Sequence, residues 1–487
     1  MARQSPPLYR QLYHMYLDRV CSGDLVKGAI LPPITDIAQK YGIAVNTVRA
    51  AFDLLQRDGY VRPIKKKGTV VLRDELPQEA VRPFLLERRE AYIGVCHMLE
   101  TLAPDMLAFG AGYCGERELN ELRRYVDGLD MNQPPRDLYV LWRHFYRSLL
   151  APANNERFFH LVVTGNRFVR FPLVLSGDQN GFLEQGRRHM RRHMHHMLDC
   201  VEKGDFHQLK EMIRAGYERG RQQIEEYLKT LGAPEINTSP KQFLWMLDRS
   251  THRLYSSIAN DLLQKIVVGF YPAGSFIPSQ TVLLEEYGAS LSSVRGALTC
   301  LSDMGVVQYE SGKGYRVMGD ARPEGTRGDS QGLSLSSFLE IAQMMIVTFP
   351  AVLESVFDNL DGSEAAFFHE RDNRLAGRPE GQFYSPLHLL INLLIRRIPD
   401  VVTQDIYRQL EMEFVYGCHY PKYYREAYPA EMAVSSNRIR QAVDCLERND
   451  REGLTHHLLQ ALLQTVELAK QAEKWGYVAK EMPFPGQ

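Results

Sequence analysis

The chain carries one pattern of about 75 residues twice, which is the mark of an internally duplicated fold. Within this pattern the matched positions run from 8 to 71 in the first copy and from 254 to 317 in the second, an offset of 246. Glycines, prolines and apolar residues recur in one register, and the matched positions include Gly28/Gly274, Pro32/Pro278, Gly42/Gly288, Val48/Val294, Arg49/Arg295, Gly59/Gly305 and Gly68/Gly314. Chance does not align so many residues of these types. Any fold for this chain must therefore contain the same unit twice.

Each copy has the residue pattern of three helices followed by a hairpin. In the first copy, residues 8–22, 35–41 and 46–57 carry apolar residues at helical spacing, and glycines end the second and third segments. Residues 60–71 then alternate around a Lys-Gly turn, as the strands of a β-hairpin do. Two helices joined by a short turn and followed by a hairpin predict a winged helix-turn-helix domain.

The remainder of the chain is helical by pattern and is interrupted by two polar segments. A weak likeness between residues 196–205 and 441–450 extends the duplication to a unit of about 240 residues. The predicted fold class is mainly α, with two winged helix-turn-helix domains, each with a small β-wing, alternating with two all-helical bundle domains. The predicted boundaries are head 1 at 1–75, helical domain 1 at 76–235, a linker at 236–248, head 2 at 249–318, a linker at 319–332 and helical domain 2 at 333–487.

The composition is typical of a reduced cytoplasmic protein. Seven cysteines are scattered along the chain without a Cys-x-x-Cys pair, which favours free thiols over a disulfide framework or a cysteine-based zinc site. The sequence has no uninterrupted run of about 18 apolar residues, and residues 1–7 lack the apolar core of a signal peptide. We therefore expect a cytoplasmic protein without a membrane segment.

The distribution of charge, and not its sum, indicates nucleic-acid binding. The net charge is −1, but residues 1–73 hold 12 Lys and Arg against 5 Asp and Glu, a surplus of +7. Residues 249–318 hold 6 against 5, a surplus of only +1, and Glu310 offsets Lys313 and Arg316. A local surplus of cations is what phosphate contacts require, because neutralised phosphates release counterions. The pattern predicts a basic DNA-binding patch on head 1 and a weaker one on head 2.

The two heads resemble the DNA-binding domain of the GntR family of bacterial transcription regulators. The shared residues are Leu8-Tyr9, Gly28 before Leu31-Pro32, Thr47-Val48-Arg49 and Gly68, with Leu254-Tyr255, Gly274 before Ile277-Pro278, Ser293-Val294-Arg295 and Gly314 in the second copy. The helical parts are similar to the all-helical ligand-binding domain of the FadR-like branch. The Pro-Pro and Asn-Thr-Val features of head 1 also resemble the shorter YtrA-like branch, so the branch stays open.

The resemblance implies a DNA-binding regulator and not an enzyme. Its implied partners are double-stranded DNA and a small-molecule effector, with no cofactor, and its assembly is a homodimer or an intramolecular pseudo-dimer of the two heads. The chain departs from the family where members carry Glu-Arg in the short helix, because Ile34-Thr35 and Gln280-Thr281 stand there. It departs again where many members carry an early arginine in the recognition helix, because Val45 and Leu291 occupy that position.

A helix that lies in the major groove presents the side chains of its N-terminal turn to the base edges. Arginine suits guanine and asparagine suits adenine, while lysines of a wing meet phosphates and the minor groove. The predicted DNA-binding residues of head 1 are Thr35, Asn46, Thr47, Arg49, Arg62, Lys65, Lys66, Lys67 and Gly68. Those of head 2 are Thr281, Ser292, Ser293, Arg295, Lys313 and Gly314.

The sequence predicts no metal site of the type found in many FadR-like sensor domains. The aligned positions are Trp142, Tyr146, Met194 and Gly216 in the first half, and His388, Ile439 and Ala461 in the second. A stripe of His189, His193 and His196 lies among arginines, which favours a solvated basic face or an anion site over a cation site. Residues 110–115 match a dinucleotide fingerprint but lack a preceding strand, so we expect an interhelical turn there.

Two functions remain open at this point. The first is a regulator whose heads read two unequal half-sites, because Asn46 and Thr47 are replaced by Ser292 and Ser293. In this interpretation an effector in the helical domains changes the spacing of the heads. The alternative is a ligand-binding or protein-interaction scaffold that keeps the fold and has lost specific DNA binding, which the missing cations favour.

Overall fold

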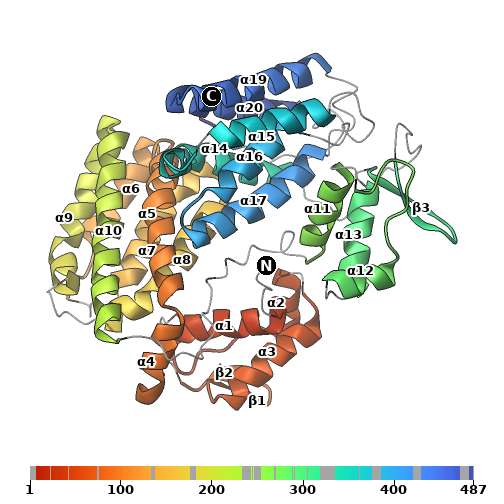
Figure 1. Cartoon of the computed structure of the whole chain (residues 1–487). Helices are drawn as coiled ribbons and strands as arrows, with labels where there is room; N and C mark the ends of the chain where they lie inside the picture. The colour runs from red at the N-terminus through yellow and green to blue at the C-terminus, as the bar shows by residue number, and fades with distance from the viewer. Residues whose placement is uncertain are drawn as a thin grey trace. The chain divides into compact units, whose positions relative to one another are not determined.

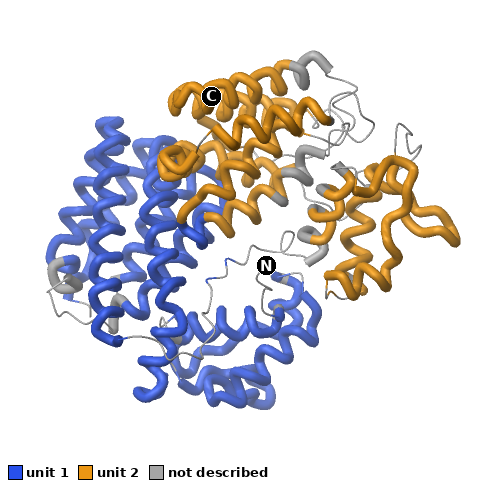
Figure 2. Tube along the Cα trace, in the orientation of Figure 1, with its two compact units in different colours: residues 1–249, 400–403 blue, residues 250–399, 404–487 orange. Residues whose placement is uncertain are grey.

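The computed structural model describes most of the chain as two compact units, which are treated separately below (Figure 2). The first comprises residues 1–249 with 400–403, and the second comprises residues 250–399 with 404–487. The described residues are 7–21, 24–41, 43–73, 76–132, 138–175, 182–232, 243, 245, 254–267, 270–287, 289, 291–303, 305–318, 335–360, 362–375, 385–419, 429–471 and 482–485.

Head 1 is a three-helix domain with a two-stranded wing (Figure 1). Its elements are α1 (Leu8–Cys21), α2 (Ile34–Tyr41), α3 (Val45–Arg57), β1 (Val61–Ile64) and β2 (Gly68–Val71). The strands pair antiparallel, and Ile30 adds a bridge to Val70. Apolar side chains spaced along one face of each helix form a single core, which includes Leu12, Tyr16, Ile37, Val48 and Leu55. This arrangement is a winged helix-turn-helix.

Head 2 repeats the same elements 246 residues later. Its elements are α11 (Leu254–Val267), α12 (Gln280–Tyr287), α13 (Leu291–Asp303), β3 (Val307–Glu310) and β4 (Gly314–Val317). Phe276 bridges Arg316 as Ile30 bridges Val70 in head 1. Every boundary is displaced by the same 246 positions, so the conserved glycines and core residues fix the local structure in both copies.

Helical domain 1 surrounds the apolar helix α5 (Arg89–Ala111). This helix packs against α7 (Leu138–Leu150), α8 (Glu156–Leu175) and α10 (Phe206–Thr230). Most side chains of α5 are buried, since the helix is apolar on nearly all faces. The other elements are α4 (Gln78–Glu87), α6 (Glu116–Asp127), α7 (Leu138–Leu150), the short 3₁₀ helix Ala151–Ala153, α8 (Glu156–Leu175), α9 (Phe182–Lys203) and α10 (Phe206–Thr230).

Helical domain 2 has the corresponding architecture around α14 (Leu335–Phe357). Its other helices are α15 (Gly362–Leu375), α16 (Pro386–Arg396), α17 (Val401–His419), α19 (Pro429–Glu447) and α20 (Arg451–Lys470). Both central helices contain a proline at the matched positions Pro104 and Pro350. Asp205 and Asp450 cap α10 and α20 in the same way. The duplication therefore extends through the helical domains, and the predicted mainly α fold class with two small β-wings is confirmed.

Within the described part of the chain, one segment, Leu335–Asn359, is long and apolar enough to cross a membrane. Glu340 and Glu354 interrupt its sequence, and 72% of its most apolar window is buried inside the protein. Such burial is expected for the central helix of a bundle.

The two ends of α5 can be compared with the sequence pattern. Apolar residues recur at helical spacing through residues 84–102, and two helices cover this stretch, because α4 ends at Glu87 and α5 begins at Arg89 after a residue with φ of −107°. The predicted interhelical turn over residues 110–115 is correct, since α5 ends at Ala111 and α6 begins at Glu116. No strand precedes this turn, so the dinucleotide fingerprint has no structural counterpart here.

We expect Gly110→Ala to destabilise the protein, because the added Cβ would clash with the Leu149 carbonyl oxygen and lie 2.9 Å from the Leu150 Cα. Such overpacking costs about 1–3 kcal/mol. Gly220→Ala is the matched control, because its Cβ meets nothing within 4 Å and alanine favours the helix by up to about 1 kcal/mol. Urea unfolding of both variants measures the difference. Equal stability of the two variants would contradict the close approach at Gly110.

Candidate nucleic-acid interface

The recognition helix of head 1 is oriented by its buried face. Val48, Ala51, Phe52 and Leu55 of α3 are buried in the head 1 core, so the opposite face lies in solvent. On that exposed face lie Val45, Asn46 and Arg49, while Thr47 is half-buried. The residues predicted to meet base edges therefore lie in the N-terminal turn and a half of α3, where a helix in the major groove presents its side chains.

Asn46 and Arg49 form a pair on this face. The guanidinium Nη1 of Arg49 donates a hydrogen bond of 2.8 Å to the amide Oδ1 of Asn46 one helical turn earlier. This bond orients the planar guanidinium and leaves the Asn46 amide nitrogen as a donor. The neighbouring helix α2 adds Thr35, which is exposed and bonds Asp36 at 3.2 Å. Asp36 lies in the first turn of α2 and places a carboxylate beside Thr35. GntR-family members usually carry an arginine where Thr35 stands.

The wing of head 1 projects an unopposed group of cations. Arg62, Lys65, Lys66 and Lys67 are all exposed, and no described residue forms a hydrogen bond or an ion pair with their side chains. Gly68 closes the turn with a φ of 97°, and Lys66 adopts a φ of 64°. A non-glycine residue in this left-handed region costs about 1–2 kcal/mol. A lysine therefore occupies a position where glycine would stabilise the turn better.

Head 2 uses the same backbone with different side chains. Val294, Ala297, Leu298 and Leu301 bury the inner face of α13, and Arg295 is exposed. The predicted residue Thr281 is exposed and Ser293 is half-buried, whereas the side chain of Ser292 lies outside the described residues. The Arg295 Nε bonds the Gln280 Oε1 of α12 at 3.2 Å. Arg295 is therefore held by the preceding helix, while Arg49 is held within its own helix.

The wing of head 2 is neutralised from within. Glu310 lies 3.5 Å from the Lys313 Nζ and 3.3 Å from the Arg316 Nη1. The matched position in head 1 is Ile64, which has no charge to offer. Gly312 and Gly314 adopt φ values of 76° and 104°, so the turn has the same left-handed positions as the wing of head 1. The two wings thus share a conformation and differ in electrostatics.

Head 1 is fastened to helical domain 1 by buried arginines that the sequence did not single out. Arg88 is 4% exposed, donates to the His14 Nδ1 at 3.1 Å and lies 3.8 Å from the Asp18 Oδ1. Its guanidinium also lies 3.6 Å from the centre of the Phe84 ring. Arg167 of α8 pairs with Asp24 at 3.1 Å, and both side chains are mostly buried. We call these residues the head 1 latch.

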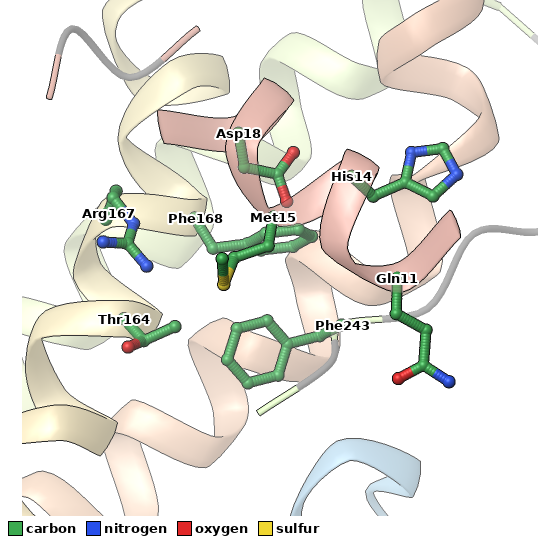
Figure 3. Close-up of a pocket in the computed structure, with 8 residues that line it drawn as sticks. All are labelled: Gln11, His14, Met15, Asp18, Thr164, Arg167, Phe168 and Phe243. Atoms are coloured by element: carbon green, nitrogen blue, oxygen red, sulfur yellow. The ribbon is translucent and has the colours of Figure 1, made fainter. Parts of the chain in front are cut away.

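A small pocket lies beside this latch, between α1 and α8 (Figure 3). Asp18 and Arg167 lie on its walls, and Phe243 packs on Phe168 with ring centres 5.1 Å apart. Burial raises the pKa of Asp18 to about 6, although Arg88 and Arg167 act in the opposite direction. The remaining lining residues are Gln11, His14, Met15 and Thr164.

Helical domain 2 buries an ionisable pair in its interior. His388 Nδ1 lies 3.3 Å from Glu411 Oε1, and Asn392 donates to the same oxygen at 2.9 Å. Burial lowers the pKa of His388 to about 4 and raises the pKa of Glu411 to about 7. Burial therefore favours the uncharged form of both groups, and shifts of this kind are concentrated at functional sites.

Helical domain 1 holds a neutral, partly buried polar group in the matching place. Asn166 donates to the Tyr217 hydroxyl at 3.0 Å, and Tyr217 also bonds Tyr146. Burial raises the pKa of both phenols, with the Tyr146–Tyr217 bond adding to the shift at Tyr146. Tyr146 and Asn166 correspond to Asn392 and Glu411 at offsets of 246 and 245. Each bundle therefore holds a buried polar cluster at one location, and the clusters differ in chemistry.

Comparison with known proteins identifies the heads. The family described as "Bacterial regulatory proteins, gntR family" matches residues 8–71 and 254–317. The HTH-type transcriptional regulator Rv1152 of Mycobacterium tuberculosis is 30% identical over 103 residues, which is 21% of this chain and 82% of that protein. The chain belongs to the GntR family. The HTH-type transcriptional regulator SmoD of Agrobacterium fabrum is 29% identical over 160 residues, which covers 28% of this chain and 68% of SmoD.

Solved structures of GntR-type proteins are similar over about half of the chain. The Escherichia coli protein McbR/YncC is 20% identical with a TM-score of 0.29, over 45% of this chain and 98% of its own. A GntR family member from Pseudomonas syringae pv. tomato is 20% identical with a TM-score of 0.23, over 47% and 90%. The family match and the curated relatives make this chain a GntR-family helix-turn-helix transcriptional regulator, and the family model matches it twice.

We expect Asp18 to make the stability of the first unit depend on pH. Its folded-state pKa of about 6 lies above the ordinary value of 3.8, so protonated Asp18 stabilises the fold at low pH. This contribution is lost as the pH rises through the interval between those values. In Asp18→Asn this side chain stays uncharged at every pH. The free energy of unfolding of the variant, relative to that of the wild type, should therefore increase by on the order of 1–3 kcal/mol between about pH 4 and pH 7. Denaturant unfolding at each pH measures the difference, and a pH-independent difference would contradict the shift.

Proposed function

We propose that this GntR-family regulator binds an operator with two unequal half-sites, one for each head. The observation that carries the proposal is the contrast between the wings, which share a backbone conformation but carry opposite electrostatic arrangements. Head 1 leaves its four wing cations open to solvent, whereas Glu310 occupies both cations of the head 2 wing. Two heads with one geometry and unequal charge are suited to two related but different DNA sites.

Head 1 supplies most of the phosphate attraction in this proposal. Arg62 and the lysines at 65–67 add charge without competing intramolecular partners among the described residues, so phosphates can bind them at little cost. Arg49 and Asn46 then read bases as a unit. The guanidinium donates to guanine O6 and N7, while the bond from Arg49 to Asn46 fixes the position of both side chains.

Head 2 contributes base contacts with less phosphate attraction. The Glu310 carboxylate lies among the groups that would meet the DNA backbone and repels it. Arg295 and the serines at 292 and 293 still occupy the N-terminal part of α13. The two heads of one chain then take the part that two subunits play in a homodimer, as an intramolecular pseudo-dimer on double-stranded DNA.

A small-molecule effector regulates this binding in the proposal, with the protein acting in the cytoplasm. The buried polar clusters of the two bundles are its candidate sites, because buried polar groups need a partner and apolar residues would pack there at lower cost. In the first unit the head 1 latch joins Asp18 of α1 to Arg88 at the start of α5, and joins Asp24, in the loop after α1, to Arg167 of α8. A shift of α8 is therefore transmitted to head 1 through the Arg167–Asp24 pair. Asn166 lies on α8 next to Arg167, which places the cluster one residue from the latch.

We expect Arg49→Ala to weaken specific operator binding by about 1–3 kcal/mol and to relax the base preference at one half-site. Arg295→Ala is the matched control in head 2 and should relax the other half-site alone. Fluorescence anisotropy on an operator selected from genomic fragments, and on versions altered in either half, measures both effects. The assignment of Arg49 fails if its replacement leaves both affinity and base preference unchanged.

We expect Glu310→Ile to strengthen DNA binding, because it gives head 2 the residue of head 1 and releases Lys313 and Arg316. Two further phosphate contacts should steepen the slope of log Kd against log salt concentration by about 1–2. The reciprocal variant, Ile64→Glu, should make the slope shallower by a similar amount. Weak binding to every fragment by the wild type, unaltered in either variant, would favour the scaffold that has lost DNA recognition.

A further inference from the structure

An arginine, Arg123, links helices α6 and α9 on the surface of helical domain 1. Arg123 of α6 donates to Asp199 at 2.7 Å and to Glu202 at 2.8 Å, and both carboxylates lie on α9. These bonds raise the pKa of Arg123 and lower those of Asp199 and Glu202. The first unit therefore shows two carboxylates, one helical turn apart, that together hold one positive charge.

Helical domain 2 keeps the two carboxylates and replaces the arginine. Asp444 and Glu447 of α19 follow their counterparts by 245 residues, and His369 of α15 follows Arg123 by 246. The helix pair is the same in each unit, because α15 packs on α19 as α6 packs on α9. A histidine is shorter than an arginine and offers a nitrogen lone pair in place of a permanent charge.

The three side chains have the geometry of an incomplete metal site. One ligand atom from each of His369, Asp444 and Glu447 lies within 4.8 Å of the others, and His369 Nε2 is 3.2 Å from Glu447 Oε1. Ligands at about 2.0–2.2 Å from a tetrahedral Zn²⁺ are about 3.4 Å apart. The exposed carboxylates reach that spacing by rotating their side chains, and solvent supplies the fourth ligand.

Neighbouring cations do not occupy the space between these ligands. Arg440, one turn before Asp444, pairs with Asp372 at 2.9 Å. Arg448 donates to the Cys445 Sγ at 3.4 Å. In the described part of the chain, two carboxylates and an imidazole thus face one another where the first unit places a guanidinium.

We propose that His369, Asp444 and Glu447 bind one divalent transition-metal ion, which fastens α15 to α19 in place of the guanidinium of the first unit. Imidazole with two carboxylates is a donor set that suits Zn²⁺. The site is separate from the buried cluster around His388 and from the two heads. Its test therefore does not depend on DNA binding.

The experiment titrates the full chain with Zn²⁺ in competition with a chromophoric chelator. The wild type should bind one ion. His369→Arg should bind this ion at least about tenfold more weakly, because the new guanidinium fills the site as Arg123 does in the first unit. Arg123→His is the reciprocal variant and should raise the stoichiometry by one. His196→Gln, on the exposed histidine stripe of α9, is the control and should leave the tight site intact.

Thermal unfolding separates binding at this site from loss of fold. Zn²⁺ should raise the Tm of the wild type and leave that of His369→Arg unchanged, while both proteins unfold cooperatively without metal. Equal stoichiometry and affinity in the wild type and His369→Arg would overturn the proposal. In that case His369 takes the place of the arginine only through its contact with Glu447, and Zn²⁺ taken up by the protein binds elsewhere.

Discussion

The structure of each head depends on the burial of one face of its recognition helix. Val48, Ala51, Phe52 and Leu55 in head 1 can enter the core only if Asn46 and Arg49 face outward. The same core receives Val61 and Val71, which sets the register of the wing and places its lysines in solvent. The side chains proposed to read bases and to bind phosphates are therefore positioned by apolar residues of the head 1 core.

The duplication has kept the residues that satisfy backbone and packing requirements and has changed the charges. Element boundaries in the two heads differ by a constant 246 positions, and glycines with positive φ recur at both wing turns. Several substitutions that separate the halves change a charge, as at Ile64 and Glu310 in the wings and at Arg123 and His369 in the bundles. A surface charge can change without loss of the fold, so the two halves are free to acquire different ligands.

The head 1 latch shows that the two halves also differ in the contacts between a head and its helical domain. Asp18 and Asp24 in head 1 meet Arg88 and Arg167 in contacts that are mostly shielded from water. The positions that match Asp18, Asp24 and Arg88 in the second half hold Gln264, Phe270 and Ser334. Among the described residues, this charged connection between head and bundle is a feature of the first half. Breaking a shielded ion pair costs more than losing an exposed one.

Local sequence signals were enough to predict the two heads, their wings and the mainly α class, because glycines, prolines and apolar periodicity act over a few residues. It also indicated the exposed face of α3, since Arg49 and Asn46 are one turn apart on a single helix. It missed the break between α4 and α5, where no proline or glycine marks the boundary. Only the tertiary structure brought Arg88 to Asp18, Asn392 to Glu411 and His369 to Glu447. Contacts of this kind depend on the rotation and offset of packed helices, which the helical period alone does not specify.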